Sequence, residues 1–215
     1  MSTSEKKRSI LGVIAHADDL ELMAGGTIAK WAKEGHKIHV MTFTDGVWES
    51  SNGEIMRNKE EALEEEKEVA KYLGYTVENL GYHATNLDFK DKHVLEVLHR
   101  INKHKVDTLI CPWEYDNNYD HQIASKIALT ASGRVPRILM GQINYYLREF
   151  FTPNFFVDIS DTWEQKMGAL KHYKSEWKRL GSDWCEFLDA TTTYYGKMSG
   201  AKRAEGFITH KFLED

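Results

Sequence analysis

The sequence predicts an α/β fold: a three-layer, Rossmann-like, mainly parallel sheet with helices on both faces. Over the first 140 residues, short apolar runs alternate with longer segments of helical spacing. This alternation is typical of βαβ units and a parallel sheet. The first run, residues 10–15, is continuously apolar, as expected of a strand covered on both faces.

The remaining elements of this part of the chain follow from the same two patterns. The strands that we expect cover residues 10–15, 38–43, 76–80 and 108–111, with a further one starting at Ile138. The expected helices cover about 20–34, 54–73, the surroundings of 94–101, and about 121–132. Glycines at positions 35 and 74 mark the ends of the first two helices.

The last third of the chain, from Tyr145, is richer in aromatic residues and less regular. We expect a strand at 155–159, then a helix capped near Ser160–Asp161, with Glu164 closing a capping box. A length of 215 residues suits one domain. We therefore predict a single domain over 1–215, with the core sheet in about 1–140 and an elaboration in about 141–215 that shapes the pocket.

The composition excludes several classes of protein. A net charge of −5 argues against a general nucleic-acid surface. Two cysteines in unrelated contexts suit a reducing compartment, and the apolar runs are too short to span a bilayer. We expect a cytoplasmic protein that acts on a small molecule, with no nucleic-acid partner and no membrane insertion; it could form a homo-oligomer.

Polar side chains gather after two of the predicted strands. The first strand runs into His16–Ala17–Asp18–Asp19, and the fourth runs into the polar segment 112–121. Ligands of open α/β sheets bind at the carboxyl edge of the strands. Both segments leave that edge, so we expect them to converge in space.

The converging residues have the chemistry of a catalytic zinc site, which takes three protein ligands and leaves one position for water. His16, Asp19 and His121 fit that set, although a two-histidine, one-carboxylate set also accepts Fe²⁺. Asp18 is then placed to act as general base on the zinc-bound water. Asp120 is a candidate to orient the imidazole of His121. The alternative is that Asp18 or Asp19 only caps the following helix.

The same residues belong to a series of motifs that resembles a known family. In chain order the motifs are His16–Ala17–Asp18–Asp19–Leu20–Glu21, Gly25–Gly26–Thr27–Ile28–Ala29, Glu34–Gly35–His36, Thr42–Phe43–Thr44–Asp45–Gly46, Arg57 with Glu60–Glu61–Ala62, Leu73–Gly74, Leu80–Gly81–Tyr82, Asp120–His121 and Ala204–Glu205–Gly206–Phe207. They resemble, in the same order, the motifs of the PIG-L/LmbE-like zinc-dependent de-N-acetylase family.

The resemblance implies a Rossmann-like sheet, and N-acetylated amino sugars or their conjugates as substrates. Carried over by position, it implies zinc ligands at His16, Asp19 and His121 and the base at Asp18. Arg57 matches the substrate-side arginine of the family, and its guanidinium suits hydroxyl pairs or a phosphate. A separate candidate is Trp113, an aromatic residue of the metal-proximal loop that could stack on a sugar ring.

Three departures from the family pattern affect the chemistry. Ala17 replaces a proline. Asn118 and Tyr119 stand where many members have His-Pro; Asn118 can donate to an oxyanion but cannot carry a proton, which leaves Asp18 or a tyrosine such as Tyr115 as general acid. His83–Ala84–Thr85 replaces an Arg-Asp-Thr triplet whose aspartate holds sugar hydroxyls.

We therefore expect a metal-dependent hydrolase that removes an N-acetyl group from an amino sugar or sugar conjugate. The alternatives are a deformylase or other small-amide hydrolase using the same site, and a catalytically silent sugar- or metal-binding module. The sequence leaves open the natural substrate, the acyl group, the general acid, the replacement for the aspartate at Ala84, the oligomeric state and the physiological metal.

Overall fold

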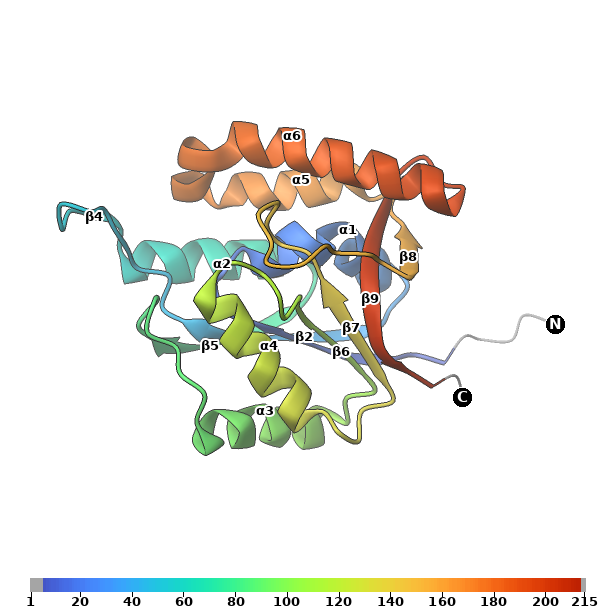
Figure 1. The fold of residues 1–215 in the computed structure, drawn as a ribbon, viewed down its shortest axis with the longest axis horizontal. Coiled ribbons are helices and arrows are strands. Elements are labelled where there is room, and N and C mark those ends of the chain that lie inside the picture. Colours follow the sequence, from blue (N-terminus) through green and yellow to red (C-terminus); the bar gives the residue numbers. More distant parts are fainter. Residues whose placement is uncertain (1–5, 214–215) are drawn as a thin grey trace.

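The computed structural model describes residues 6–213, and within that range six helices surround a seven-stranded sheet (Figure 1). The strands of this sheet are β1 Ser9–Ile14, β2 Lys37–Thr44, β5 Thr76–Tyr82, β6 Thr108–Pro112, β7 Arg137–Gly141, β8 Phe155–Asp158 and β9 Ala204–Phe212. The helices are α1 Asp19–Lys33, α2 Lys59–Leu73, α3 Asp91–His104, α4 Tyr119–Ala131, α5 Trp163–His172 and α6 Lys174–Ser199.

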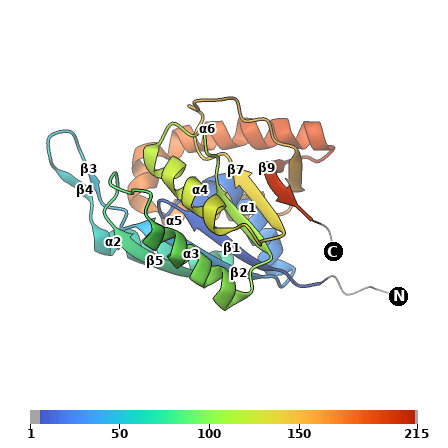
Figure 2. The same cartoon turned by 60° about the horizontal axis from the view of Figure 1, so that its bottom comes forward.

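The sheet order is β5-β2-β1-β6-β7-β9-β8, and the first five strands of this order are parallel to one another. Helices α3 and α4 cover one face of the sheet, while α1 and α2 cover the other (Figure 2). Each face has its own apolar cluster, which is why strands such as β6 are buried along their whole length. The predicted fold class is confirmed.

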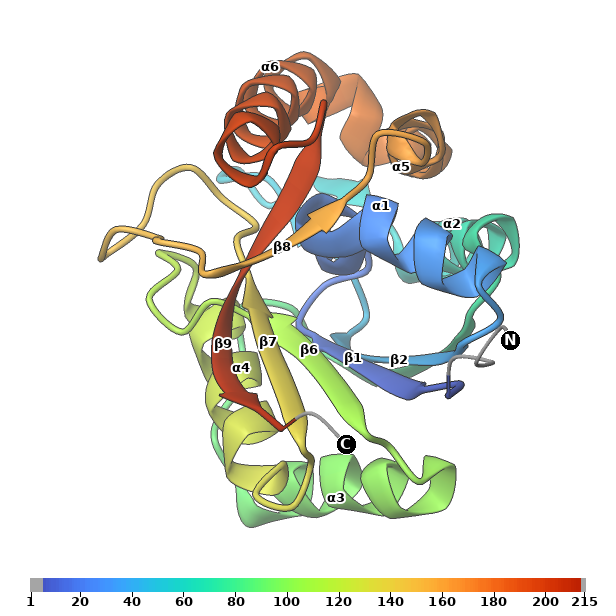
Figure 3. The same cartoon turned by 90° about the vertical axis from the view of Figure 1, so that its right-hand side faces the viewer.

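The C-terminal third extends both the sheet and the helical layer. Strand β9 runs antiparallel between β7 and β8. Helix α5 packs on α1 and α2, and α6 lies outside α5 and across β9 (Figure 3). Within residues 6–213, no helix combines the length and the apolar character needed to cross a membrane. The division near residue 140 stays a prediction.

The predicted elements were wrong in two places. Residues 54–58 were expected in a helix, but Ile55–Arg57 forms β4, paired with β3 (Trp48–Glu49) in a hairpin. The helix begins only at Lys59, because the Asn58 side chain accepts the Glu61 N–H and caps it.

The second error concerns the start of α5 and the elements after it. Helix α5 starts at Trp163 with Thr162 at the N-cap position, so the capping box expected near Ser160 and Asp161 is not what starts this helix. The 26-residue helix α6 and the strand β9 were not predicted at all.

Candidate active site

Three side chains from two distant segments meet at the carboxyl edge of the sheet. His16 follows β1, Asp19 opens α1, and His121 lies in the first turn of α4. His16 Nδ1 lies 3.1 Å from His121 Nε2, and Asp19 Oδ1 lies 3.1 Å from His121 Nε2. The third side, from His16 Nδ1 to Asp19 Oδ1, measures 3.6 Å.

This triangle fits a metal ion. Ligands about 2.0–2.1 Å from a tetrahedral zinc lie roughly 3.3 Å from one another, close to the three distances found. Each side chain offers one lone-pair atom to the same point in space. Among residues 6–213, His16, Asp19 and His121 are the only group of three or more such side chains that could hold an ion.

A carboxylate stands behind each imidazole, on the side away from the triangle. His16 Nε2 lies 3.3 Å from Asp120 Oδ2, and His121 Nδ1 lies 3.1 Å from Asp116 Oδ2. Such carboxylates fix the orientation of metal-binding imidazoles. The prediction that Asp120 orients His121 is therefore corrected: Asp120 faces His16, and Asp116 faces His121.

Backbone and side-chain amides hold both carboxylates in place. Asp120 accepts the Thr85 N–H at 2.7 Å, from the loop after β5. Asp116 is fully buried and accepts the Asn118 N–H at 2.8 Å and the Asn144 side-chain amide at 3.0 Å. Asp116 could not be singled out from the sequence because several acids share its loop, and only the fold shows which of them faces an imidazole.

The adjacent carboxylates Asp18 and Asp19 have opposite surroundings. Asp19 Oδ2 accepts the N–H groups of Ala15 at 3.0 Å and His16 at 2.8 Å, which leaves Oδ1 for an ion. Although burial would raise the pKa of Asp19, the imidazoles of His121 and His16 hold it well below its usual range.

Asp18 is buried as well, but it faces negative charge. Burial, followed by the charges of Glu176 and Asp19, raises the pKa of Asp18 to about 7, against the opposing effect of Arg57. Although Asp18 occupies the N-cap position of α1, its side chain makes no cap hydrogen bond within the described chain. The alternative that Asp18 only caps the helix is thus unsupported. The raised pKa of Asp18 suits a group that exchanges a proton near neutral pH.

Asn118 sits at the start of α4, and its side chain caps that helix. Its Oδ1 accepts the Asp120 N–H at 2.9 Å and the His121 N–H at 3.4 Å. The amide NH₂ group of Asn118 is then the part that remains to donate, as the predicted oxyanion contact requires. The same cap holds the helical turn that carries His121.

The two residues predicted to contact substrate are both buried. Arg57 is 4% exposed, and its guanidinium pairs with Glu65 at 3.1 Å and with Glu176 at 3.9 Å. Trp113 is 9% exposed and packs in the core against Tyr115. Asp18, Asp19 and His121 are buried to a similar degree, so the substrate contacts of Arg57 and Trp113 stay predictions. The charge of Arg57 also acts on Asp18.

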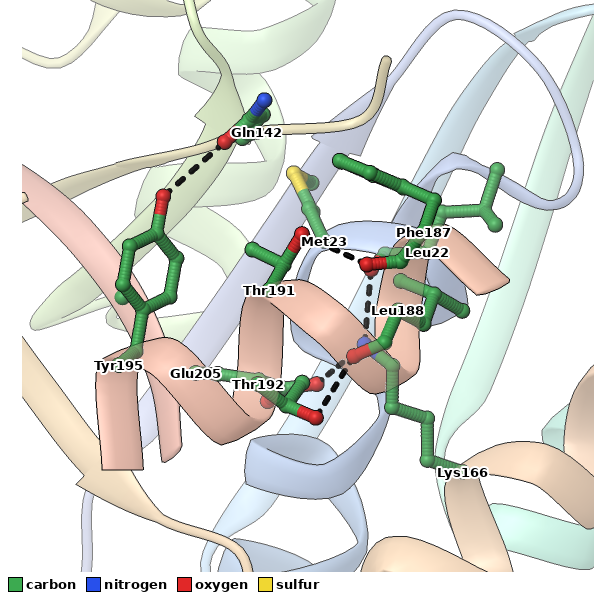
Figure 4. A pocket seen from close by; sticks show the side chains of 11 residues that line it. Leu22, Met23, Gln142, Lys166, Phe187, Leu188, Thr191, Thr192, Tyr195 and Glu205 are labelled. Atoms are coloured by element: carbon green, nitrogen blue, oxygen red, sulfur yellow. Dashed lines mark hydrogen bonds and ion pairs between the residues drawn. The ribbon is translucent and has the colours of Figure 1, made fainter. Parts of the chain in front are cut away.

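The helix that carries Asp19 is anchored at its middle by a buried ion pair (Figure 4). Glu205 accepts the N–H groups of Gly26 at 3.0 Å and Thr27 at 2.7 Å, and it pairs with the Lys166 ammonium at 2.5 Å. Lys166 also donates to the Leu22 carbonyl at 2.7 Å. Strand β9 and helix α5 thereby hold α1, a link that the sequence analysis did not predict.

Comparison with known proteins adds to this geometry. The chain is 29% identical to the diacetylchitobiose deacetylase of Thermococcus kodakarensis over 230 residues, covering 96% of this chain and 85% of that one. It is 28% identical over 194 residues to the 4-oxalmesaconate hydratase of Pseudomonas putida, covering 80% of this chain and 74% of the relative.

The fold is found in solved structures as well. A conserved protein from Thermus thermophilus superposes with a TM-score of 0.82 at 26% identity, covering 97% of both chains. Residues 11–132, more than half of the chain, match the PIG-L family, described as GlcNAc-PI de-N-acetylase. With the motifs, the fold and the strand-end triad in agreement, the chain belongs to the PIG-L family.

Proposed function

We propose that this protein is a metal-dependent hydrolase that removes an N-acetyl group from an amino sugar or sugar conjugate, with Zn²⁺ as the metal and Fe²⁺ as the alternative. One observation carries the proposal: His16 Nδ1, Asp19 Oδ1 and His121 Nε2 converge within 3.1 to 3.6 Å of one another, next in the chain to the buried carboxyl group of Asp18. Family membership and the named activity of the Thermococcus relative support the reaction class.

His16, Asp19 and His121 would hold the ion. When bound, Zn²⁺ supplies a Lewis acid that polarises a carbonyl and lowers the pKa of water. Asp18 takes a proton from the attacking water, and its pKa of about 7 in the metal-free chain suits that exchange. The Asn118 amide donates to the oxyanion. Asp116 and Asp120 hold the imidazoles of His121 and His16, respectively, in a fixed orientation.

An amino-sugar substrate is supported by the named activity of the deacetylase relative. Arg57 and Trp113 stay candidates for its contacts. Exposed side chains on the loops that lead to the triangle, His83 and Tyr119, are further candidates. Ala84, in place of the aspartate of the resemblance, points to a sugar contact that differs from that of the relatives. The cytoplasmic location and a homo-oligomeric state remain predictions.

The test is product analysis with N,N′-diacetylchitobiose and N-acetylglucosamine. Purified protein loaded with Zn²⁺ should release acetate and a free amine, and a chelator should abolish the release. Re-addition of Zn²⁺ or Fe²⁺ then identifies the metal that restores activity. Formate from an N-formyl analogue, without acetate from the N-acetyl sugars, would favour the deformylase. Metal binding without release of either acid would favour a silent module and contradict the proposal.

A hydratase is the second candidate, because the Pseudomonas relative of 28% identity is named as one. A hydratase adds water across a carbon–carbon double bond and releases no acid. Incubation with an unsaturated carboxylate such as 4-oxalmesaconate, with its ultraviolet absorbance followed over time, separates the two reactions. We favour amide hydrolysis because the deacetylase relative matches more of both chains.

A further inference from the structure

A third histidine at the carboxyl edge of the sheet faces a carboxylate, and it lies outside the metal triangle. His83 follows β5, and its Nδ1 lies 3.8 Å from Asp45 Oδ2 at the end of β2. The His83 side chain is 57% exposed, whereas His121 is buried and His16 largely so. The pairs His16–Asp120 and His121–Asp116 are closer, at 3.3 Å and 3.1 Å, and their histidines point to the common ion position.

The Asp45 carboxylate is fixed by the backbone. Its Oδ1 accepts the N–H of Val47 at 3.2 Å and that of Ala84 at 3.4 Å. The Asp45 N–H donates to the Tyr82 carbonyl at 2.7 Å, which ties the ends of β2 and β5 together. At 3.8 Å the Asp45 carboxylate is too far from His83 for a hydrogen bond, but it is a fixed negative charge beside the imidazole.

The loop that carries His83 borders the metal triangle. Two residues after His83, the Thr85 N–H donates to Asp120 at 2.7 Å, and Asp120 faces His16 at 3.3 Å. On the other side, Asp45 follows Thr44, whose N–H donates to the Ala15 carbonyl at 3.0 Å, directly before His16. The exposed side chain of His83 thus lies on a loop that is hydrogen-bonded to the carboxylate facing His16.

Hydrolysis of an unactivated amide requires a proton on the leaving nitrogen, because an amide anion is a very poor leaving group. Asn118 cannot supply that proton. In the proposed reaction Asp18 takes the proton of the attacking water. Imidazole exchanges protons near neutral pH, and the exposed imidazole of His83 lies on the loop that contacts Asp120.

We propose that His83, beside the fixed carboxylate of Asp45, is the general acid that protonates the leaving amine; this rests on the proposed N-deacetylase function. Water adds to the acyl carbon and gives one proton to Asp18. The carbon–nitrogen bond then breaks, its electron pair stays on nitrogen, and the protonated His83 gives that nitrogen a proton. The acid formed loses its remaining proton to the amine or to water, proton transfer from Asp18 to His83 restores both groups, and acetate and the amine leave.

The experiment compares His83→Ala and His83→Gln with wild type on two substrates. With N,N′-diacetylchitobiose we expect kcat to fall about 100-fold or more, as for loss of a general acid. With 4-nitrophenyl acetate, whose phenolate leaves without a proton, we expect kcat to change less than about threefold. Zinc affinity should be unchanged. His99→Gln, an exposed imidazole on α3, is the matched control and should keep full activity.

A second measurement gives a decision even where the ester is a poor substrate. Free imidazole added to His83→Ala should restore amide hydrolysis in proportion to its concentration, and it should not restore Asp18→Ala. Unchanged amide turnover in both His83 variants, or a loss that imidazole does not rescue, would overturn the assignment. A wild-type protein that releases no acetate would instead refute the proposed function itself.

Discussion

Helix α1 contacts two clusters of buried charge, and they are built on opposite principles. At its N-terminus, the lone pairs of His16 Nδ1, His121 Nε2 and Asp19 Oδ1 all face one point and crowd one another at 3.1 to 3.6 Å. At its middle, the Lys166 ammonium meets the Glu205 carboxylate, so that donor and acceptor satisfy each other.

The difference separates a binding site from a structural anchor. Three electron-pair donors facing one another gain little from their mutual contacts and need a cation or protons between them. An ammonium paired with a carboxylate that also accepts two backbone N–H groups is complete as it stands. Burial and charge alone do not distinguish the two clusters; the direction of the lone pairs does.

The largest effect on activity should come from Asp18, which lies beside the first cluster but is not one of its three metal-binding residues. Asp18→Asn keeps the size of the side chain but removes the proton acceptor, so we expect kcat for acetate release to fall by about 10²–10⁴. Zinc affinity, measured by competition with a chromogenic chelator, should change only slightly. Glu60→Gln, an exposed acid on α2, is the control. Full activity in Asp18→Asn would refute the assignment of the base.

The second cluster should govern stability instead of chemistry. Lys166→Met leaves the Glu205 charge buried without its cation, and we expect a loss of about 3–5 kcal/mol in the free energy of unfolding. Urea denaturation measures it. The double variant Lys166→Met/Glu205→Gln should recover part of the loss, because no unpaired charge remains. A single variant as stable as wild type would show that the pair does not anchor α1.

A smaller effect is expected from the carboxylate behind His121. Asp116→Asn retains a polar group of the same size but weakens the hold on the imidazole, and we expect zinc affinity to fall about 10–100-fold. Isothermal titration measures the affinity. Asp88→Asn, a half-buried aspartate in the loop before α3, should leave the zinc affinity unchanged. If both variants bind zinc alike, the carboxylate has no orienting role.

The mildest test changes only the pH. Burial disfavours the charged imidazoles, but the Asp19 carboxylate outweighs it and raises the pKa of His16 and of His121 above the ordinary value. A raised pKa means that the metal-free site retains a proton near neutral pH, which an ion must displace. Zinc affinity should therefore weaken as the pH is lowered. For each proton that zinc must displace, the loss is up to roughly tenfold per pH unit.

Proton release gives this prediction an independent readout. The apparent binding enthalpy measured between about pH 6 and about pH 8 should depend on the ionisation enthalpy of the buffer. An affinity that does not vary with pH, together with a buffer-independent enthalpy, would contradict the raised pKa values.

The part of the fold made from local patterns could be predicted, and the part made from long-range pairing could not. Strands β1 and β6 are mostly apolar and buried on both faces, so their composition identifies them. Strand β9 contains Glu205 and His210 and lies near the sheet edge, where one face can be polar. Its place between β7 and β8 depends on pairing across distant segments, which composition does not encode.

The sequence by itself determined the α/β class and the set of donors, His16, Asp19 and His121, because strand ends of a parallel sheet share one edge and ligand chemistry narrows the residue types. Only the tertiary structure decided that Asp116 faces His121 and that Arg57 is buried. The physical reason is direction: orientation and burial of a side chain depend on neighbours from other segments, which are known only when the chain is folded.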